Sequence, residues 1–273
     1  MPSVRLHPPC PALRRWIVGY WQSGPAVESG ATGQEWVLPD GHAHLALRLD
    51  GTPLRRWVDG EPHARSIGDL ILAGPHSRAY RKELAPRSRS LGVVFRPGAL
   101  RALFGIAPHE LADSHVALKD VWGRDAAALR ERIHDAAPAR HVELLETRLL
   151  ARLRPWHGLH PQVASRLAEV ASGMPVLAIA RAAGYSARRF TDLFHKGVGM
   201  TPRRYAGLCR FARVLPAAAA GTAWADVALD GGYSDQAHLI REFRAHAGMT
   251  PGQYRRAAPR ALRHVPIAET TTD

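Results

Sequence analysis

One stretch of sequence occurs twice in the C-terminal third of this chain of 273 residues. The first copy starts at Ile179 and reads IARAAGYSARRFTDLFHKGVGMTPRRYAG. The second starts at Val227 and reads VALDGGYSDQAHLIREFRAHAGMTPGQYRR. Both contain Gly-Tyr-Ser, then a Phe, then Gly-Met-Thr-Pro-x-x-Tyr. Because chance rarely produces a match of this length, the repeat indicates one structural unit used twice, and two copies are too few for a solenoid.

Each copy predicts two helices joined by a tight turn. In the first copy, Gly184 follows an apolar helical face and can adopt the left-handed conformation that a tight turn needs. Ser186 is placed to cap the next helix, which ends at Gly199, and Thr201 with Pro202 begins another helix. The corresponding residues of the second copy are Gly232, Ser234, Gly248, Thr250 and Pro251. This pattern is typical of a helix-turn-helix unit, although a small helical bundle of another kind has the same hydrophobic spacing.

The second helix of each copy is polar opposite its apolar stripe. At 100° per residue from Phe190, the side chains of Thr191, His195, Arg188 and Asp192 fall between about 100° and 200°. In the second copy, the same angles from Leu239 are occupied by Ile240, Arg244, Ala237 and Arg241, with Gln236 beside them. Arg, Gln, His and Thr side chains reach base edges or phosphates, whereas an ordinary solvated helix more often carries Glu–Lys pairs. The faces therefore favour nucleic-acid binding.

From about Gln162 to Arg256, a third of the chain, the sequence resembles the DNA-binding domain of the AraC/XylS family of bacterial transcriptional regulators. The second copy, ALDGGYSDQAHLIREFRAHAGMTPGQYR, is close to the signature of that family. The resemblance implies seven helices, in which a long helix from Thr201 through Leu215 joins two helix-turn-helix units. From Thr201 to Ala219 this helix would span roughly 28 Å, against about 34 Å between successive major grooves. One chain could thus address two adjacent grooves without dimerising.

The resemblance also implies which residues contact DNA. Base-reading positions map to Arg188, Thr191, Asp192, Gln236, Ala237, Ile240 and Arg241. Contacts to the DNA backbone are expected from Arg189, His195, Lys196, Arg210, Arg213, Ser234, His238 and Arg244. Asp192 stands where a basic or neutral residue is common, so its carboxylate either accepts from cytosine N4 or pairs with Arg188 and reads nothing. Pro216 interrupts the linker helix, which we expect to bend or shorten it.

The N-terminal half predicts antiparallel strands followed by helices. Short apolar runs alternate with turn residues over 1–96, namely EWVLPDGH, AHLALRLDGTP, RRWVDGEP, GDLILAGPH and SLGVVFRPG. The helical runs that follow are ALRALFGI, GRDAAALRERIHDA and HVELLETRLLARL. The segment PDGHAHLALRL, with GDLILAGP and LGVVFRPGAL, resembles a poorly characterised sensor-like domain that often precedes this DNA-binding domain. For the family, a cupin-like β-barrel is the expected architecture.

We therefore expect an α+β chain of two domains. The first, over 1–157, is an antiparallel β-sandwich or cupin-like barrel (1–96) with accessory helices (97–155). The second, over 158–258, is the all-α DNA-binding domain, and 259–273 forms a flexible tail. The linker-like segment RPWHG predicts little packing across the boundary. A fragment that starts near Leu159 is expected to fold and bind DNA by itself.

Aromatic and histidine side chains of the first half suggest a pocket for a small effector. The candidates are Trp16, Trp21, Trp36, His42, His44 and Phe95. Such aromatic residues are more often ordinary core. His42, His44 and His76 also invite a metal site, which would need a carboxylate such as Asp40 or Glu83. Two polar histidines at the start of a strand explain the pair more simply, so we expect neither a metal nor another cofactor.

Composition and charge limit the function classes. The formal net charge is +13, and 156–258 carries 13 basic and 6 acidic residues. This excess favours a polyanionic partner, although an arginine-rich composition gives the same balance. An enzyme with a DNA-binding appendage is one alternative. Some DNA alkyl-transfer repair proteins join this domain to a four-cysteine zinc site, which the two cysteines exclude, while a metal-dependent cupin enzyme stays open. Another alternative is a nucleoid-like protein that binds DNA without specificity.

The leading interpretation is a non-enzymatic, sequence-specific transcriptional regulator. Its expected partner is double-stranded DNA, with RNA polymerase, an unknown small-molecule effector and a second copy of the chain as further candidates. No apolar run approaches the ~18 residues of a membrane span, and the N-terminus does not resemble a secretory signal. We therefore expect no membrane partner and a cytoplasmic location. The effector, the operator and the direction of regulation stay open.

Overall fold

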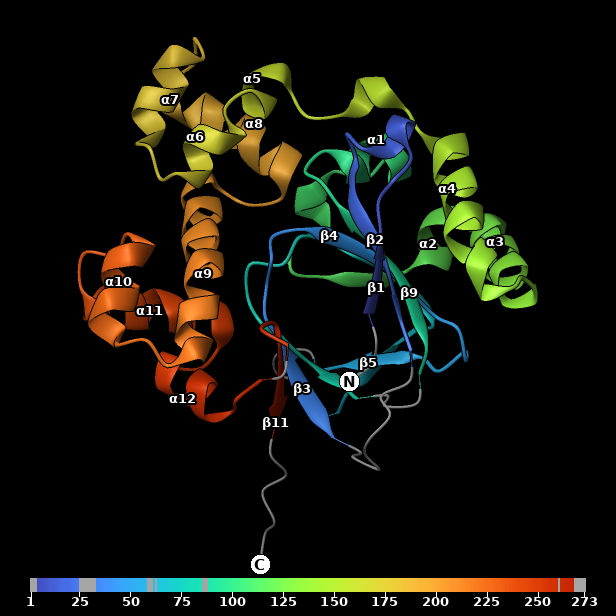
Figure 1. Cartoon of the computed structure of the whole chain (residues 1–273). Coiled ribbons are helices and arrows are strands. Elements are labelled where there is room, and N and C mark those ends of the chain that lie inside the picture. Colours follow the sequence, from blue (N-terminus) through green and yellow to red (C-terminus); the bar gives the residue numbers. More distant parts are fainter. Residues whose placement is uncertain are drawn as a thin grey trace, which may run out of the picture.

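Two parts of different architecture make up the chain, a β-rich N-terminal part and a helical C-terminal part (Figure 1). The computed structural model describes residues 4–24, 33–57, 61, 63–84, 88–259 and 261–267. The expected fold class is confirmed, because antiparallel sheets with accessory helices precede an all-α part that contains two helix-turn-helix units.

Two antiparallel sheets form the β-rich part. The first sheet has the strand order β1-β2-β9-β4-β7-β10 and the second has the order β11-β3-β8-β5-β6. The strands of the first sheet are β1 Val4–His7, β2 Ile17–Ser23, β4 Ala43–Arg48, β7 Leu70–Ala73, β9 Ser90–Phe95 and β10 His115–Ala117. Those of the second are β3 Gln34–Val37, β5 Leu54–Arg56, β6 Arg65–Gly68, β8 Tyr80–Glu83 and β11 His264–Ile267.

Helices cover one face of the first sheet and enclose the main core with it. They are α1 Ala99–Phe104, α2 Leu118–Trp122, α3 Arg124–Asp135 and α4 His141–Arg152. Side chains alternate across β4, so Leu45 and Leu47 enter this core, whereas His44 and Ala46 face the second sheet and stay partly accessible. Burial of a Leu or Phe side chain in such a core contributes about 1.5–3 kcal/mol.

The C-terminal helices follow the predicted pattern closely. They are α5 Pro161–Ala164, α6 Leu167–Ala171, α7 Val176–Ala182, α8 Ala187–Val198, α9 Pro202–Ala220, α10 Trp224–Gly231, α11 Gln236–Ala247 and α12 Pro251–Arg256. These are eight helices among the described residues, one more than the seven that the resemblance implies. Thr201 caps α9 by accepting from the Arg204 N–H at 3.4 Å, as expected. The helix continues through Pro216 to Ala220, so the expected shortening is wrong. The proline lies on the exposed side of the helix.

The expectation of a flexible tail over 259–273 is wrong for 264–267. There the chain forms β11, which pairs antiparallel with β3 of the N-terminal part (Figure 1). The Leu38 N–H donates to the Arg263 carbonyl at 2.8 Å, which extends the pairing by one rung. Val265 is 1% exposed and packs in the core of the helical part. A strand from the C-terminus therefore completes a sheet of the first domain. Residues 268–273 of the expected tail lie outside the described part.

The segment between the two parts is packed as well, which corrects the expectation of a boundary with little packing. The Arg154 N–H donates to the Ala102 carbonyl at 2.8 Å. A Cβ added at Gly158 would lie 2.7 Å from the Trp16 ring, so the linker backbone lies directly on that side chain. Leu159 contacts Gly98 on one side and Gly197 of α8 on the other.

Candidate nucleic-acid interface

In the first helix-turn-helix unit, α7 and α8 are joined by a turn at Gly184. The turn places Gly184 at a φ of +75°, the left-handed region that favours glycine. The Ser186 hydroxyl accepts from the Arg189 N–H at 3.2 Å and caps α8, which is worth about 1 kcal/mol. Phe190 and Phe194 are fully buried below α8. The helix therefore turns its opposite face, which carries Arg188, away from the core.

The second unit has the same architecture, but its cap differs from the predicted one. Asp235, not Ser234, caps α11, because the Asp235 carboxylate accepts from the His238 N–H at 2.7 Å. The Ser234 hydroxyl instead lies 3.1 Å from that carboxylate. The extra residue of the second copy thus falls at the start of the helix. With the caps aligned, Arg241 occupies the position that Asp192 occupies in the first unit.

The predicted base-reading residues differ in exposure. Arg188, Gln236, Ala237, Ile240 and Arg241 are exposed, and Ile240 is 37% exposed despite its apolar side chain. Thr191 and Asp192 are partly covered. Among the described residues, neither Arg188 nor Arg241 forms a salt bridge, so both guanidinium groups are available to a ligand.

Asp192 is engaged within its own helix. Its carboxylate lies 3.6 Å from a guanidinium nitrogen of Arg189 and 3.2 Å from Nζ of Lys196. The predicted alternative of a pair with Arg188 is therefore wrong, because Asp192 pairs with Arg189, three residues before it, and with Lys196, four residues after it. Arg188 is left outside this triad.

Among the residues predicted to contact the DNA backbone, Arg210 is the one most engaged within the protein. Its guanidinium donates to both carboxylate oxygens of Glu242, at 2.9 and 3.0 Å, and lies over the Tyr233 ring. The Arg210 side chain is only 20% exposed, so this pair joins α9 to α11. This pair favours a structural role for Arg210 over the predicted phosphate contact. The neighbouring Arg213 is exposed on α9, and Arg244 is exposed on α11.

The N-terminal domain reaches the end of α8. The His195 ring centroid lies 5.4 Å from that of His109, in the short turn Pro108–Glu110. Partial burial, together with the His109 charge, lowers the pKa of His195. A Cβ at Gly199 would lie 2.5 Å from Cγ of Pro75, so only glycine fits where α8 ends against the N-terminal domain.

The six residues predicted for an effector pocket do not line one pocket. Trp16 and Phe95 lie in the core below the helices, and Trp36 packs against the core of the DNA-binding part. Trp21 lies on Gly92, where a Cβ would come within 2.1 Å of its ring. The expectation of one shared pocket is therefore corrected, because these side chains belong to separate packing regions of the molecule.

His42 and His44 are both held by neighbouring groups. Nδ1 of His42 lies 2.9 Å from the Phe95 carbonyl, and Nε2 of His44 lies 3.0 Å from the Asp40 carboxylate. Burial raises the pKa of Asp40, but the charges and hydrogen bonds of His44 and His42 outweigh this and hold it well below its usual range. Over the described part of the chain, no group of three His, Cys, Asp or Glu side chains is arranged to hold a metal ion.

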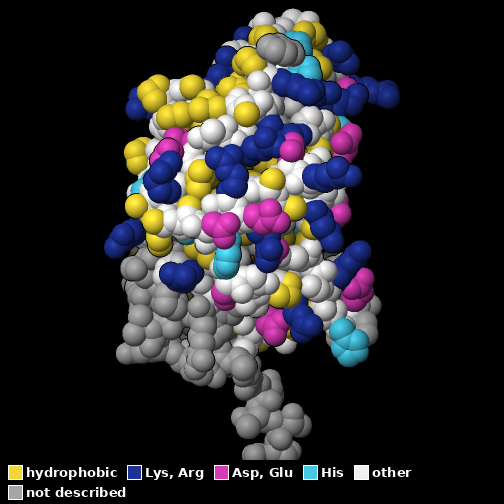
Figure 2. Space-filling view, turned by 90° about the vertical axis from the view of Figure 1, so that its right-hand side faces the viewer, with side chains coloured by type: hydrophobic (Ala, Val, Ile, Leu, Met, Phe, Trp, Pro, Cys, Tyr) yellow, Lys and Arg dark blue, Asp and Glu magenta, His cyan; other side chains and the backbone are white. Residues whose placement is uncertain are grey.

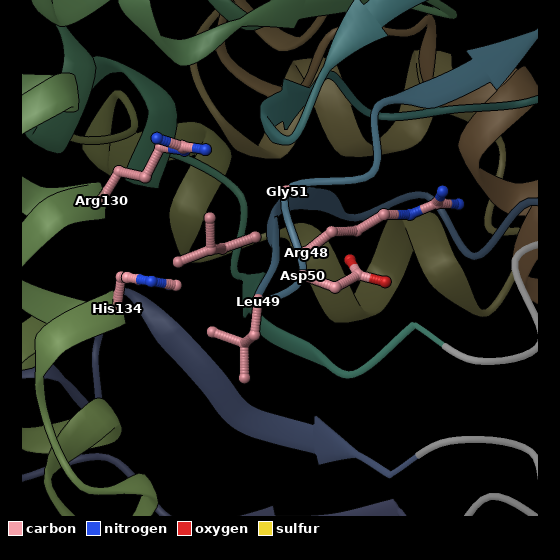
Figure 3. Close-up of a pocket in the computed structure, with 7 residues that line it drawn as sticks. Arg48, Leu49, Asp50, Gly51, Arg130 and His134 are labelled. Carbon is pink, nitrogen blue, oxygen red and sulfur yellow. The ribbon is translucent and has the colours of Figure 1, made fainter.

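A small pocket of about 80 Å³ lies between α3 and the turn after β4 (Figure 3). Arg130 and His134 approach it from α3, and Leu49 approaches from the turn. Pockets for small molecules commonly measure about 300–1,000 Å³. This one is too small to mark an effector site.

The face of the molecule on the side of α3 and α4 carries mixed charge. Figure 2 shows the face that lies on the right in Figure 1, the side of α3 and α4. Basic and acidic side chains intermix there with apolar ones, so that face carries no continuous basic surface among the described residues. None of the helices in the described ranges combines the length and the apolar character needed to span a bilayer.

Comparison with known proteins agrees with this division of the chain. Residues 162–257 match a family described as "Helix-turn-helix domain". Residues 5–117 match a family described as "Domain of unknown function (DUF6597)". No curated protein matches the chain.

Several solved structures are similar at low identity. The C-terminal domain of AraT, a response regulator from Geobacillus stearothermophilus, is 18% identical, with a TM-score of 0.34, over 41% of this chain and 93% of that one. ToxT from Vibrio cholerae is 9% identical, with a TM-score of 0.41, over 86% of this chain and 97% of that one. A ToxT structure with a bound unsaturated fatty acid is 9% identical, with a TM-score of 0.42, over 82% of this chain and 94% of that one.

The family match of residues 162–257 spans both helix-turn-helix units and the helix between them. This helix-turn-helix domain, preceded by the domain of unknown function, supports the resemblance of the chain to the AraC/XylS family of DNA-binding transcriptional regulators.

Proposed function

We propose that this regulator recognises a specific operator by placing α8 and α11 in two adjacent major grooves, with α9 as the spacer between them. One observation carries the proposal. Two units of the same design present their outward faces from the ends of a single helix. The 19 residues of α9 correspond to roughly 28 Å, close to the distance of about 34 Å between successive grooves.

The reading positions in this proposal lie in the first half of each recognition helix. Arg188 in the first unit and Arg241 in the second have the geometry to donate twice to guanine, an interaction worth about 1–3 kcal/mol of discrimination. Gln236 suits adenine, and Ile240 suits the methyl group of thymine. Thr191 and Ala237 complete the two faces. Asp192 acts in this proposal by holding Arg189 and Lys196 in position.

Backbone contacts form a second set. We assign to it Arg213, Arg244, Ser234, His238 and His195, with Arg189 and Lys196 free to exchange Asp192 for a phosphate. Arg210 is left out because Glu242 occupies its guanidinium. Phosphate contacts of this kind give affinity and salt dependence but not sequence preference.

We further propose that residues 158–258 form the DNA-binding unit and that the N-terminal domain regulates it in response to a small effector. The contacts of Pro75 and Pro108 with Gly199 support such coupling, since they join the N-terminal domain to the end of α8. A second copy of the chain and RNA polymerase are the macromolecular partners that this role predicts besides DNA.

Selection of bound fragments from genomic DNA by the purified full-length chain tests the proposal. Specific regulators bind their sites about 10³–10⁷ times more tightly than random DNA at physiological salt. Enrichment of one sequence pattern, with at least a thousandfold preference at fixed salt, is the expected result. Equal affinity for all fragments would instead identify a nucleoid-like protein that binds DNA without specificity.

A further inference from the structure

Three segments around the linker carry arginines and no acidic side chain. They cover residues 8–16, 95–107 and 151–160. The first includes the turn before β2, the second includes the end of β9 and α1, and the third includes the linker. Their exposed arginines are Arg14, Arg15, Arg96, Arg101 and Arg154. These five residues, called the arginine patch below, carry positive charge that no carboxylate of their own segments opposes.

The first two segments are bonded to each other. Nε of Arg96 donates to the Arg14 carbonyl at 3.1 Å, and the Arg96 N–H donates to the Trp16 carbonyl at 2.8 Å. The Arg15 guanidinium lies over the Trp16 ring, whose residue is almost fully buried. Arg14, Arg15 and Arg96 therefore lie together around the Trp16 side chain.

The third segment brings the other two arginines to the same region. The Arg154 N–H donates to the carbonyl of Ala102, the residue that follows Arg101 on α1. The Gly158 backbone lies on the Trp16 ring. Three segments that are far apart in the sequence thus place five positive charges in one region of the molecule.

Within the part of the chain that the structure describes, no ion pair neutralises the arginine patch. Arg14 and Arg96 each donate there only through Nε, to a backbone carbonyl, so the two terminal nitrogens of each guanidinium stay available to a ligand. Glu146 of α4 reaches the first segment, but its carboxylate accepts from the Cys10 N–H at 2.7 Å. Exposed cations gathered without opposing charges attract a polyanion.

The arginine patch adjoins the first helix-turn-helix unit. Leu159 lies on Gly98 of the second segment and on Gly197 of α8. The helices α1, α7 and α8 and the linker lie at one end of α9, whereas α10, α11 and α12 lie towards the other end (Figure 1). With α8 and α11 in successive grooves, the duplex runs along α9. Duplex that continues beyond the first unit therefore leaves α9 at the end where the arginine patch lies.

We propose that the arginine patch binds the phosphate backbone of the duplex that flanks the operator next to the first unit. Guanidinium groups donate in pairs to phosphate oxygens, and such contacts do not depend on the base sequence. The N-terminal domain then adds affinity to the complex, while the recognition helices select the sequence. The proposal rests on the proposed function, because the placement of α8 and α11 defines which flank the arginine patch meets.

Operator fragments with different flanks test this contact. A short fragment ends at the edges of the two grooves that the recognition helices occupy. A second fragment adds about one and a half turns of duplex of arbitrary sequence beyond the first unit, and a third adds the same length beyond the second unit. Fluorescence anisotropy measures the affinity of the full-length chain for each, over about 50–200 mM salt. Contact of two arginines with phosphates should steepen the slope of log K against log salt by about 1.8, on the second fragment only.

Two double variants that remove the same net charge form a matched pair. Arg14→Gln combined with Arg96→Gln removes two charges from the arginine patch and should abolish the steeper slope on the second fragment. Arg89→Gln combined with Arg132→Gln removes two exposed charges elsewhere, since Arg89 precedes the opposite end of β9 and Arg132 lies on α3. This control should keep the steeper slope. Circular dichroism checks that both variants fold.

A second variant of the arginine patch makes the test independent of the first. Arg101→Gln combined with Arg154→Gln removes two charges from the other side of the patch and should also reduce the steeper slope on the second fragment. It takes the place of the first variant if that one does not fold. All variants should bind the short fragment with the same sequence preference as the natural chain, because none of these arginines reads bases.

Three results would overturn the proposal. The first is the same slope on all three fragments, and the second is equal steepening by the two flanks, which would indicate binding of DNA without a defined side. The third is a steeper slope that both variants of the arginine patch keep. Specific binding of the short fragment by the full-length chain is measured first, so that a failure of operator recognition is distinguished from a failure of the flanking contact.

Discussion

Nδ1 of His246 on α11 donates a hydrogen bond to the backbone carbonyl of Ser77, 169 residues earlier in the chain, at 2.8 Å. Both residues are buried. The hydrogen bond connects the second recognition helix to the N-terminal domain. The strand β11 pairs with β3 of the same domain. The DNA-binding part is therefore joined to the first domain both by the linker and by contacts that come after it in the sequence.

Val265 tests the contribution of β11 to stability. Val265→Ala should lower the free energy of unfolding by about 1–3 kcal/mol, because the valine is fully buried in the core of the helical part. Pro266→Ala, one residue further on the exposed side, is the matched control. Urea denaturation of the full-length chain measures both. Equal stability of the two variants would mean that β11 does not hold the domains together.

A fragment that starts near Leu159 lacks part of the core of the helical part. It loses Leu38, which belongs to the core of the helical part, and a cut before β11 also removes Val265. We expect a fragment over 159–259 to be helical by circular dichroism and to keep its operator preference. It should also unfold at lower urea concentration than the full-length chain. A helical fragment without operator preference would show that the first domain contributes to the DNA-reading surface.

Arg241 and Arg244 share a helix but should differ in effect. Arg241→Ala should lose about 1–3 kcal/mol of binding free energy on the best operator and much less on random DNA, because it removes a bidentate contact to guanine. Arg244→Ala should weaken both by the same factor, as expected for a phosphate contact. Anisotropy titrations at fixed salt distinguish them. Equal losses for Arg241→Ala on both DNAs would reassign that side chain to the backbone.

Arg213 and Arg210, three residues apart on α9, make another matched pair. Arg213→Gln should lower the slope of log K against log salt by about 1, whatever the DNA sequence. Arg210→Gln should leave the slope unchanged and reduce stability, because it leaves Glu242 without its partner. An unchanged slope in Arg213→Gln would place that side chain away from DNA.

Glu35 predicts how stability depends on pH. Burial raises its pKa, but the hydrogen bond with His264 and the charge of Lys82 outweigh this and lower it to about 2. The lowered pKa of Glu35 stabilises the fold at pH values above 4.5, the pKa of the same carboxyl group in the unfolded chain. This stability is lost as the pH falls from 4.5 towards 2. The loss should approach about 3 kcal/mol. Glu35→Gln should make the free energy of unfolding depend less on pH between pH 5 and pH 2. The same pH dependence in the variant and the natural chain would contradict the prediction.

Local features of the DNA-binding part could be predicted from the sequence. Gly184, Ser186 and Thr201 perform the roles that their residue types and spacing suggest, because turns and caps depend on a few neighbouring residues. The second cap was misplaced by one position, since Ser234 and Asp235 are both good caps and only the structure shows which one starts the helix. The apolar strands β4, β7 and β9 were predicted for the same local reason.

Contacts between distant segments could not be predicted. His76, Tyr80 and His115 lie on three segments that are adjacent only because the two sheets face each other. The strand β8, with the sequence YRKE, has little apolar character, so its pattern does not indicate a strand. β11 is only four residues long, and its partner strand lies more than 200 residues earlier. Pairing over such separations leaves no periodic signal in a single sequence.

A methylation-interference footprint of the full-length chain on its selected operator shows whether one chain reads two adjacent major grooves. We predict two clusters of guanines on one face of the duplex, about 10 base pairs apart. Arg188→Ala should erase interference in one cluster, and Arg241→Ala should erase it in the other. A single cluster that both substitutions weaken alike would mean that α8 and α11 do not read separate grooves.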